Sequence, residues 1–177
     1  MKKNSLITFL IVLFIGCAQN ALAKNQCSKN DEIKLSIFSK NDYKLYSYYC
    51  SADEGVYLKN FINNSKKTIF LNEYSDFAAN EPPKLLAVSV YKGKSKKPPI
   101  LIVLSTAYHC CTPQMEGDLY KVNLYQINEK NNAFSLKDIT SIFGKNSDGF
   151  EGQSEGEFFY KYKDIASIKN WLEKNYR

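Results

Sequence analysis

The stretch ILIVLSTAYHCCTPQ, residues 100–114, joins an uninterrupted apolar run to a motif in which the only histidine of the chain precedes two adjacent cysteines. Residues 100–104 are apolar at every position, so both faces of a strand here would be buried. The run therefore predicts a central strand that is covered on both sides. We expect this strand to end at Ser105 and TAYHCCTPQ to form a loop beyond it.

Further strands are predicted on both sides of this run. Upstream, residues 85–91 are largely apolar, and the lysines and prolines of residues 92–99 suit an exposed hairpin loop. Downstream, residues 119–127 alternate apolar and polar side chains, the period of a half-buried strand. These three segments form the clearest antiparallel unit of the sequence.

The segments before this unit favour strands as well. Residues 32–38 and 43–50 alternate with period two and predict a hairpin, with a tight turn at Asn41-Asp42. Residues 51–64 leave helix and strand open, since Ser51 and Glu54 have capping-box spacing whereas the residues after Glu54 favour a strand. A short strand is expected at residues 68–71, followed by a polar segment to residue 83.

The last third of the chain predicts a loop, a strand and a helix. Residues 134–143 are mixed, residues 144–156 are rich in glycine and acid, and residues 158–162 suggest a short strand. Asp164 is placed to cap a helix, in which Ile165, Ile168, Trp171 and Leu172 form an apolar stripe. We predict an α+β fold: one domain with a mainly antiparallel sheet of about six or seven strands and a C-terminal helix packed on it.

The N-terminus has the order of a secretory signal peptide. Two lysines precede an apolar run over residues 6–15, which is too short to cross a bilayer, and the small residues Ala21 and Ala23 follow. Residues 1–23 are expected to be removed, leaving residues 24–177 as a single exported domain. Alternatively, Phe14-Ile15-Gly16-Cys17 resembles the lipobox of bacterial lipoproteins, with Phe14 where leucine is usual. Cleavage at this motif would leave Cys17 lipidated, and the lipid would anchor the protein to the outer membrane.

Four cysteines remain after export: Cys27, Cys50, Cys110 and Cys111. An even number in an oxidising compartment indicates two disulfides, with three possible pairings. We favour Cys110 and Cys111 bonding separately to Cys27 and Cys50, because loops of about 60 to 85 residues would each contribute roughly 4 kcal/mol. A bond between the adjacent Cys110 and Cys111 remains the alternative.

Metal binding and catalysis at His109-Cys110-Cys111 are not expected. Adjacent side chains tend to diverge and chelate a metal less easily than spaced pairs. A nucleophilic cysteine needs a free thiolate, and four cysteines can pair completely. With one histidine and no catalytic fingerprint elsewhere, we assign no catalytic residue, metal or cofactor, and expect a binding protein rather than an enzyme.

Charge narrows the choice of partner. The formal net charge is +6, with few arginines among the basic residues, which argues against a nucleic-acid binder. The acidic segment 146–157 does not fit an EF-hand, and a solvated loop is the favoured interpretation, with calcium binding left open. Most tyrosines alternate within predicted strands, so Tyr108, in the predicted loop, is the aromatic contact candidate.

The C-terminal part of the chain resembles a class of proteins rather than one family. Phe143-Gly144, Asp148-Gly149-Phe150 and the segment YKDIASI, residues 162–168, look like tails of small exported bacterial proteins. With the export signal and the cysteines, the chain resembles periplasmic immunity proteins and enzyme inhibitors. The resemblance implies no particular functional residue.

Two functions follow as expectations. The first is an exported, periplasmic immunity-type protein that binds and inhibits a toxin or envelope hydrolase. Its predicted contact residues are Tyr108, His109, Pro113, Gln114, Met115 and Glu116, because loops on rigid scaffolds commonly carry binding. The alternative is a non-catalytic module that binds peptidoglycan or another cell-wall glycan, suggested by the richness in lysine and tyrosine. Contact with a membrane is expected only if Cys17 is lipidated.

Overall fold

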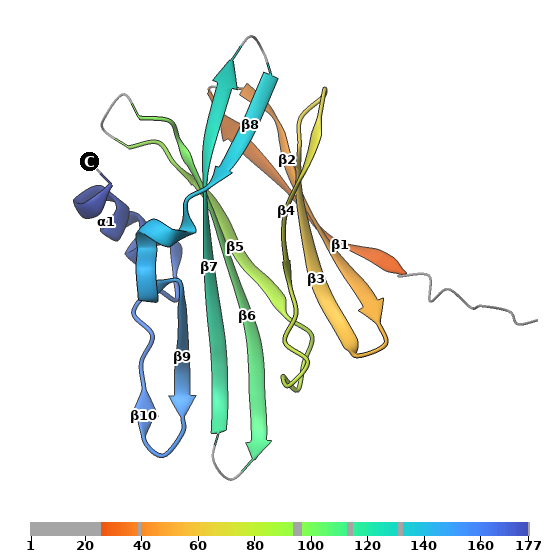
Figure 1. Cartoon of the computed structure of the whole chain (residues 1–177), viewed down its shortest axis with the longest axis vertical. Helices are drawn as coiled ribbons and strands as arrows, with labels where there is room; N and C mark the ends of the chain where they lie inside the picture. The colour runs from red at the N-terminus through yellow and green to blue at the C-terminus, as the bar shows by residue number, and fades with distance from the viewer. Residues whose placement is uncertain (1–25, 39, 94–96, 113–114, 131–132, 177) are drawn as a thin grey trace, which may run out of the picture.

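A computed structural model describes residues 26–38, 40–93, 97–112, 115–130 and 133–176 (Figure 1). The predicted signal peptide and Cys17 lie outside the described residues. Within them, the chain forms two antiparallel sheets and one α-helix. The mainly antiparallel pairing and the C-terminal helix are confirmed, whereas the prediction of one sheet of six or seven strands is wrong, because the strands form a four-stranded and a six-stranded sheet.

The first sheet consists of four strands in the order β1-β2-β3-β4. Their bounds are β1 (Cys27–Ile37), β2 (Lys40–Ala52), β3 (Gly55–Asn63) and β4 (Thr68–Tyr74). The predicted hairpin is confirmed, but its turn lies at Phe38, which has a φ of 52°, and residues 41 and 42 belong to β2. The ambiguous segment after Ser51 is the strand β3, so its capping-box spacing marks no helix.

The second sheet has the order β10-β9-β7-β6-β5, and β8 also pairs with β7. Its strands are β5 (Lys84–Tyr91), β6 (Ile100–Thr112), β7 (Met115–Lys130), β8 (Ala133–Asp138), β9 (Asp148–Gln153) and β10 (Glu157–Phe158). Residues 116–121 of β7 pair with β9 and residues 125–130 pair with β8, so β8 and β9 share one edge of β7. The acidic segment expected to be a loop is therefore largely a hairpin of β9 and β10.

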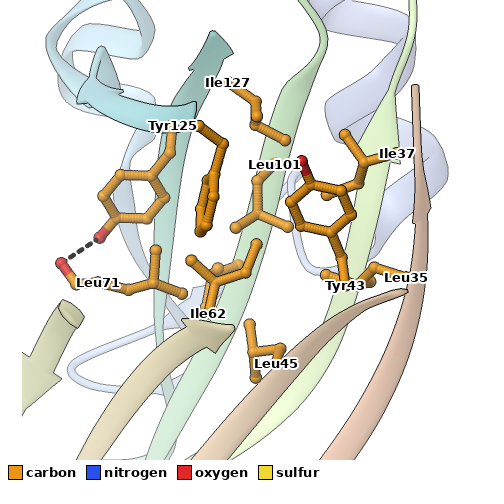
Figure 2. Close-up of a cluster of buried hydrophobic side chains, with 11 residues drawn as sticks. Leu35, Ile37, Tyr43, Leu45, Ile62, Leu71, Leu101, Tyr125 and Ile127 are labelled. Carbon is orange, nitrogen blue, oxygen red and sulfur yellow. Dashed lines mark hydrogen bonds between the residues drawn. The ribbon is translucent and has the colours of Figure 1, made fainter. Parts of the chain in front are cut away.

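The two sheets pack face to face around the main apolar core (Figure 2). The first sheet contributes Leu35, Ile37, Tyr43, Leu45, Ile62 and Leu71, and the second contributes Leu101, Val103, Tyr125, Ile127 and Phe134. The buried Tyr125 hydroxyl donates a hydrogen bond to the Leu71 carbonyl, 3.2 Å away on the other sheet. Alternation along each strand reveals a buried face but not which other strands cover it, which is why one sheet was predicted instead of two.

A third layer covers the other face of the second sheet. The 3₁₀ helix η1 (Thr140–Asn146) and the helix α1 (Ile165–Asn175) pack on the even-numbered residues of β6, namely Ile100, Ile102 and Leu104. The predicted helix and its Asp164 cap are confirmed, since the Asp164 side chain accepts a hydrogen bond from the Ser167 N–H. The strand predicted at residues 158–162 ends at Phe158, and Tyr160 and Tyr162 pack in this layer.

The central position of β6 is confirmed. Residues 100–107 are all buried, with odd-numbered side chains toward the first sheet and even-numbered ones toward the helices. The predicted end of the strand is wrong, because β6 continues through His109, Cys110 and Cys111 to Thr112. The motif expected to form a loop is therefore the end of the central strand.

The connections between strands gather at two ends of the sandwich (Figure 1). The lower end in that view holds the β2–β3 turn, the β4–β5 loop, the paired ends of β6 and β7 and the β9–β10 turn. The upper end holds the β1–β2, β3–β4 and β5–β6 connections and the ends of β7 and β8.

Candidate functional site

The predicted contact residues lie where β6 and β7 end. Tyr108 and His109 are in β6, and Met115 and Glu116 begin β7. Pro113 and Gln114, which complete the predicted set, lie outside the described residues. The structure thus brings the four described candidates together at one end of the molecule.

Cys110 and Cys111 form a disulfide with each other, and Cys27 bonds to Cys50. His109 is opposite Gly117 and Thr112 is opposite Met115, so both cysteines share the single partner Glu116 in a β-bulge. Cys111 has a φ of 69°, a conformation outside the regular strand. The bulge breaks the alternation that would otherwise point adjacent side chains to opposite faces.

The favoured pairing of Cys110 and Cys111 with Cys27 and Cys50 is wrong. Cys27 and Cys50 are direct partners in the β1–β2 register, with Cα atoms 4.0 Å apart. Both lie on the face of the first sheet that points away from the second sheet, the face of Tyr46 and Tyr48 rather than of Leu45. A bond to β6 would have to pass through the sheet, which disulfide geometry forbids.

His109 is held by a residue of the loop that joins the two sheets. Its Nε2 lies 3.0 Å from the Asp76 Oδ2, and the two side chains are only 13% and 14% exposed. Asp76 belongs to the β4–β5 loop, residues 75–83. Because the pair is mostly buried, His109 orders this end of the molecule more than it offers surface to a partner.

Asn80 ties the same loop to the backbone of β6. Its N–H donates to the Tyr108 carbonyl at 2.8 Å, and its Oδ1 accepts from the Cys110 N–H at 2.6 Å. Asp76 and Asn80 were predicted only as part of a polar segment, because no local pattern marks a residue that contacts the chain 30 or more positions later. Together they hold the β4–β5 loop against the end of β6.

The outer part of the site is formed by the half-buried Tyr108 and the exposed Cys111 and Glu116. The Tyr108 hydroxyl donates to the Glu116 Oε1 at 3.3 Å, and desolvation followed by the charge of Glu116 raises the pKa of Tyr108. Beside them, β9 approaches β7 closely: a Cβ on Gly152, whose φ is +151°, would lie 2.1 Å from the Glu116 carbonyl oxygen. Only glycine fits there, so the β9–β10 hairpin is packed against the site.

Acidic side chains dominate this end, which we call the acidic end. Among the described residues of its turns and strand ends, they are Asp53, Glu54, Asp76, Glu81, Glu116, Asp118, Glu155 and Glu157. Lys84, paired with Glu81, lies among them, and Lys29 near the start of β1 and Lys163, paired with Glu151, lie close by, so the acids outnumber the lysines. The acidic end therefore presents a negative surface although the chain as a whole is basic.

Large aromatic side chains are exposed at the same end. Phe77 in the β4–β5 loop is 44% exposed, Phe158 at the end of β10 is 50% exposed, and Phe159 after it is 77% exposed. Exposed aromatic rings are enriched in surfaces that bind proteins. The combination of rings with acidic groups offers both apolar contact and charge.

The opposite end, which we call the basic end, has the reverse charge. The described residues of its turns and strand ends include the exposed lysines Lys40, Lys66, Lys67, Lys92, Lys97 and Lys130. Asp42 and Glu129 are the acids there, and Glu129 is paired with Lys40. Charge is therefore separated along the long axis of the sandwich.

The described part of the chain holds neither a cluster of metal ligands nor a helix that could span a membrane. No group of three or more His, Cys, Asp or Glu side chains there could hold a metal ion. No described helix has the length and apolar character needed to cross a bilayer.

Comparisons with known proteins give no family for this chain. No protein-family model, curated protein or solved structure matches it.

Proposed function

We propose that this chain is an exported, periplasmic immunity-type protein that binds and inhibits a cationic toxin or envelope hydrolase at its acidic end. The observation that carries the proposal is the concentration of carboxylates and exposed phenylalanines around Tyr108 and Glu116. A positively charged enzyme would be attracted to this surface at long range and would meet apolar rings on contact.

Rigidity of the surface supports the proposal. The His109–Asp76 pair, the Asn80 hydrogen bonds and the Cys110–Cys111 bond hold strand ends and a loop from both sheets in one arrangement. A surface that is ordered before binding loses less conformational entropy when the partner arrives. Loops gathered at one end of a β-sandwich are also a known way to present a binding surface.

The proposal assigns binding rather than catalysis. The chain has one histidine, and its ring is paired with Asp76 instead of with a nucleophile. Cys27, Cys50, Cys110 and Cys111 are all bonded, so none offers a thiolate. Occlusion of an enzyme's substrate site by a fixed surface needs none of these groups.

Charge reversal tests the proposal. The partner is sought as a secreted toxin or hydrolase encoded beside this chain, and its affinity is measured by titration calorimetry. Glu81→Lys with Glu116→Lys should weaken binding at least about tenfold and abolish inhibition, because rim charges govern attraction. Glu173→Lys, in α1, is the control and should bind as the wild type does.

Two results would contradict the proposal. One is the absence of any binding or protection by the wild-type protein against that neighbour. The other is equal affinity of the Glu81→Lys/Glu116→Lys variant and the wild type.

A further inference from the structure

The outer face of the first sheet carries a row of aromatic rings that no described element covers. Residues of β2 and β3 alternate so that Leu45 and Ile62 face the core while Tyr46, Tyr48 and Phe61 face outward. The Tyr48 and Phe61 rings meet edge to face at 5.8 Å, and Phe61 meets Phe70 of β4 at 5.6 Å. Phe70 itself is 50% exposed.

Three of these rings, Tyr46, Tyr48 and Phe61, line an open groove of about 510 Å³, and Phe70 lies beside it. The groove is lined by Cys27, Tyr46, Tyr48, Lys59, Phe61, Asn63 and Thr68. It runs along the sheet from the Cys27–Cys50 bond toward the β3–β4 turn. Cross-strand aromatic pairs stabilise a sheet without any ligand, but that role does not require an open groove with polar groups along its rim.

The rim of the groove carries hydrogen-bonding groups and positive charge. The Asn63 amide donates to the Thr68 hydroxyl at 2.5 Å where the groove meets the β3–β4 turn. The Lys59 ammonium lies 5.4 Å from the Tyr57 ring centroid and 3.3 Å from the Glu73 carboxylate. Lys66 and Lys67, in the turn itself, are both exposed.

Two more lysines stand on the same face of the sheet. Lys29 lies over the Tyr46 ring at 5.0 Å, and Lys44 is 2.7 Å from Glu32. The described lysines around the groove outnumber the two carboxylates, Glu32 and Glu73, that balance some of them. The surroundings of the groove therefore favour a ligand with negative charge.

We propose that this groove binds cell-wall glycan, whose sugar chain bears short peptides that carry carboxylate groups. The apolar C–H faces of the sugar rings would lie against Tyr46, Tyr48 and Phe61. Sugar hydroxyls would bond to Asn63 and Thr68, and carboxylates would approach Lys66 and Lys67. This is a second site, separate from the acidic end, and it would hold the inhibitor on the wall while the acidic end stays free.

Binding of purified, protein-free peptidoglycan and of its soluble disaccharide-peptide fragment tests this inference. Wild-type protein should pellet with the polymer and bind the fragment by calorimetry, less tightly as salt rises. Tyr48→Ala should weaken binding of the fragment about tenfold, because the sugar loses the aromatic face on which it packs. Lys66→Gln with Lys67→Gln should weaken it and reduce its dependence on salt.

Matched controls separate this site from loss of fold and from the acidic end. Phe159→Ala removes a more exposed ring outside the groove and should leave glycan binding unchanged. Each variant must keep the thermal unfolding midpoint of a folded protein; if Tyr48→Ala does not fold, Tyr46→Ala takes its place. The Glu81→Lys/Glu116→Lys variant should bind glycan fully, so either proposal can fail without the other.

Three results would overturn the inference. They are no binding of polymer or fragment at low salt, equal affinity of Tyr48→Ala and the wild type, and binding through the same residues to phosphatidylglycerol vesicles but not to glycan. The last result would identify the face as a lipid surface instead.

Discussion

At the scale of single residues, the end of β6 shows how one bulge creates a site. Cys110 and Cys111 oppose Glu116 alone, so their sulfurs can meet, and the next residue back, His109, turns toward the β4–β5 loop. Asp76 then supplies the partner that a mostly buried imidazole needs. The consequence is a strand end whose side chains are fixed before any partner binds.

A double-mutant cycle tests the His109–Asp76 pair. Asp76→Ala leaves the imidazole without its partner and should lower the free energy of unfolding by about 1–3 kcal/mol. His109→Ala should have a smaller added effect in the Asp76→Ala background, giving a coupling of about 0.5–3 kcal/mol. Urea unfolding measures each variant, with the exposed Asp53→Ala as control. Strictly additive effects would mean that the pair contributes nothing.

At the scale of elements, a segment can be predicted from the sequence when its structure depends on side chains that are neighbours in the chain. It cannot be predicted when its structure depends on contacts with distant segments. The apolar run at residues 100–104 and the stripe of α1 depend on side chains next to one another, and both were predicted. The adjacent disulfide depends on the register of β6 with β7, and the roles of Asp76 and Asn80 depend on contacts between sheets. Such long-range pairing leaves no periodic signal in the sequence.

The two disulfides belong to different elements and should respond differently to removal. Cys27 and Cys50 close the β1–β2 hairpin with a separation of 23 residues, worth roughly 3 kcal/mol in the chain-entropy model. Cys110 and Cys111 are neighbours and close no chain loop, so their bond restrains only the local strand end.

Serine substitution of each pair tests this contrast. Cys27→Ser with Cys50→Ser should lower the free energy of unfolding by roughly 3 kcal/mol. Cys110→Ser with Cys111→Ser should lower it by less than about 1 kcal/mol while weakening partner binding, because only the local order is lost. Denaturant unfolding and calorimetry measure the two effects. If Cys110→Ser with Cys111→Ser lowered the free energy of unfolding more than Cys27→Ser with Cys50→Ser, the adjacent bond would stabilise the whole fold and the contrast would be wrong.

At the scale of the whole molecule, the fold has three layers, and the central strand β6 lies between the first sheet and the helical layer. The two ends of this sandwich differ in the sign of their charge. The antiparallel connections bring acidic turns to one end and lysine-rich turns to the other (Figure 1). Net charge and composition conceal this separation, since both average over the chain. The separation becomes visible only when the strand order assigns each turn to an end.

The layered core also predicts how stability changes at high pH. Burial raises the pKa of Tyr74, Tyr125 and Tyr160 above the ordinary 10.0. Tyrosine with a raised pKa contributes stability that is fully present below pH 10 and is lost as pH rises further. Tyr125→Phe should therefore reduce the fall in unfolding free energy above pH 10 by up to about 1.4 kcal/mol per pH unit. An unchanged slope in this variant would contradict the buried, hydrogen-bonded Tyr125.

The central claim is that the acidic end, and not the basic end, meets the partner. Amide hydrogen exchange of the protein with and without its toxin or hydrolase partner measures this directly. The account predicts that binding slows exchange in residues 75–83, 108–112, 115–119 and 153–158. Slowed exchange confined to the lysine-bearing turns at residues 64–67 and 92–99, with the acidic end unchanged, would contradict it.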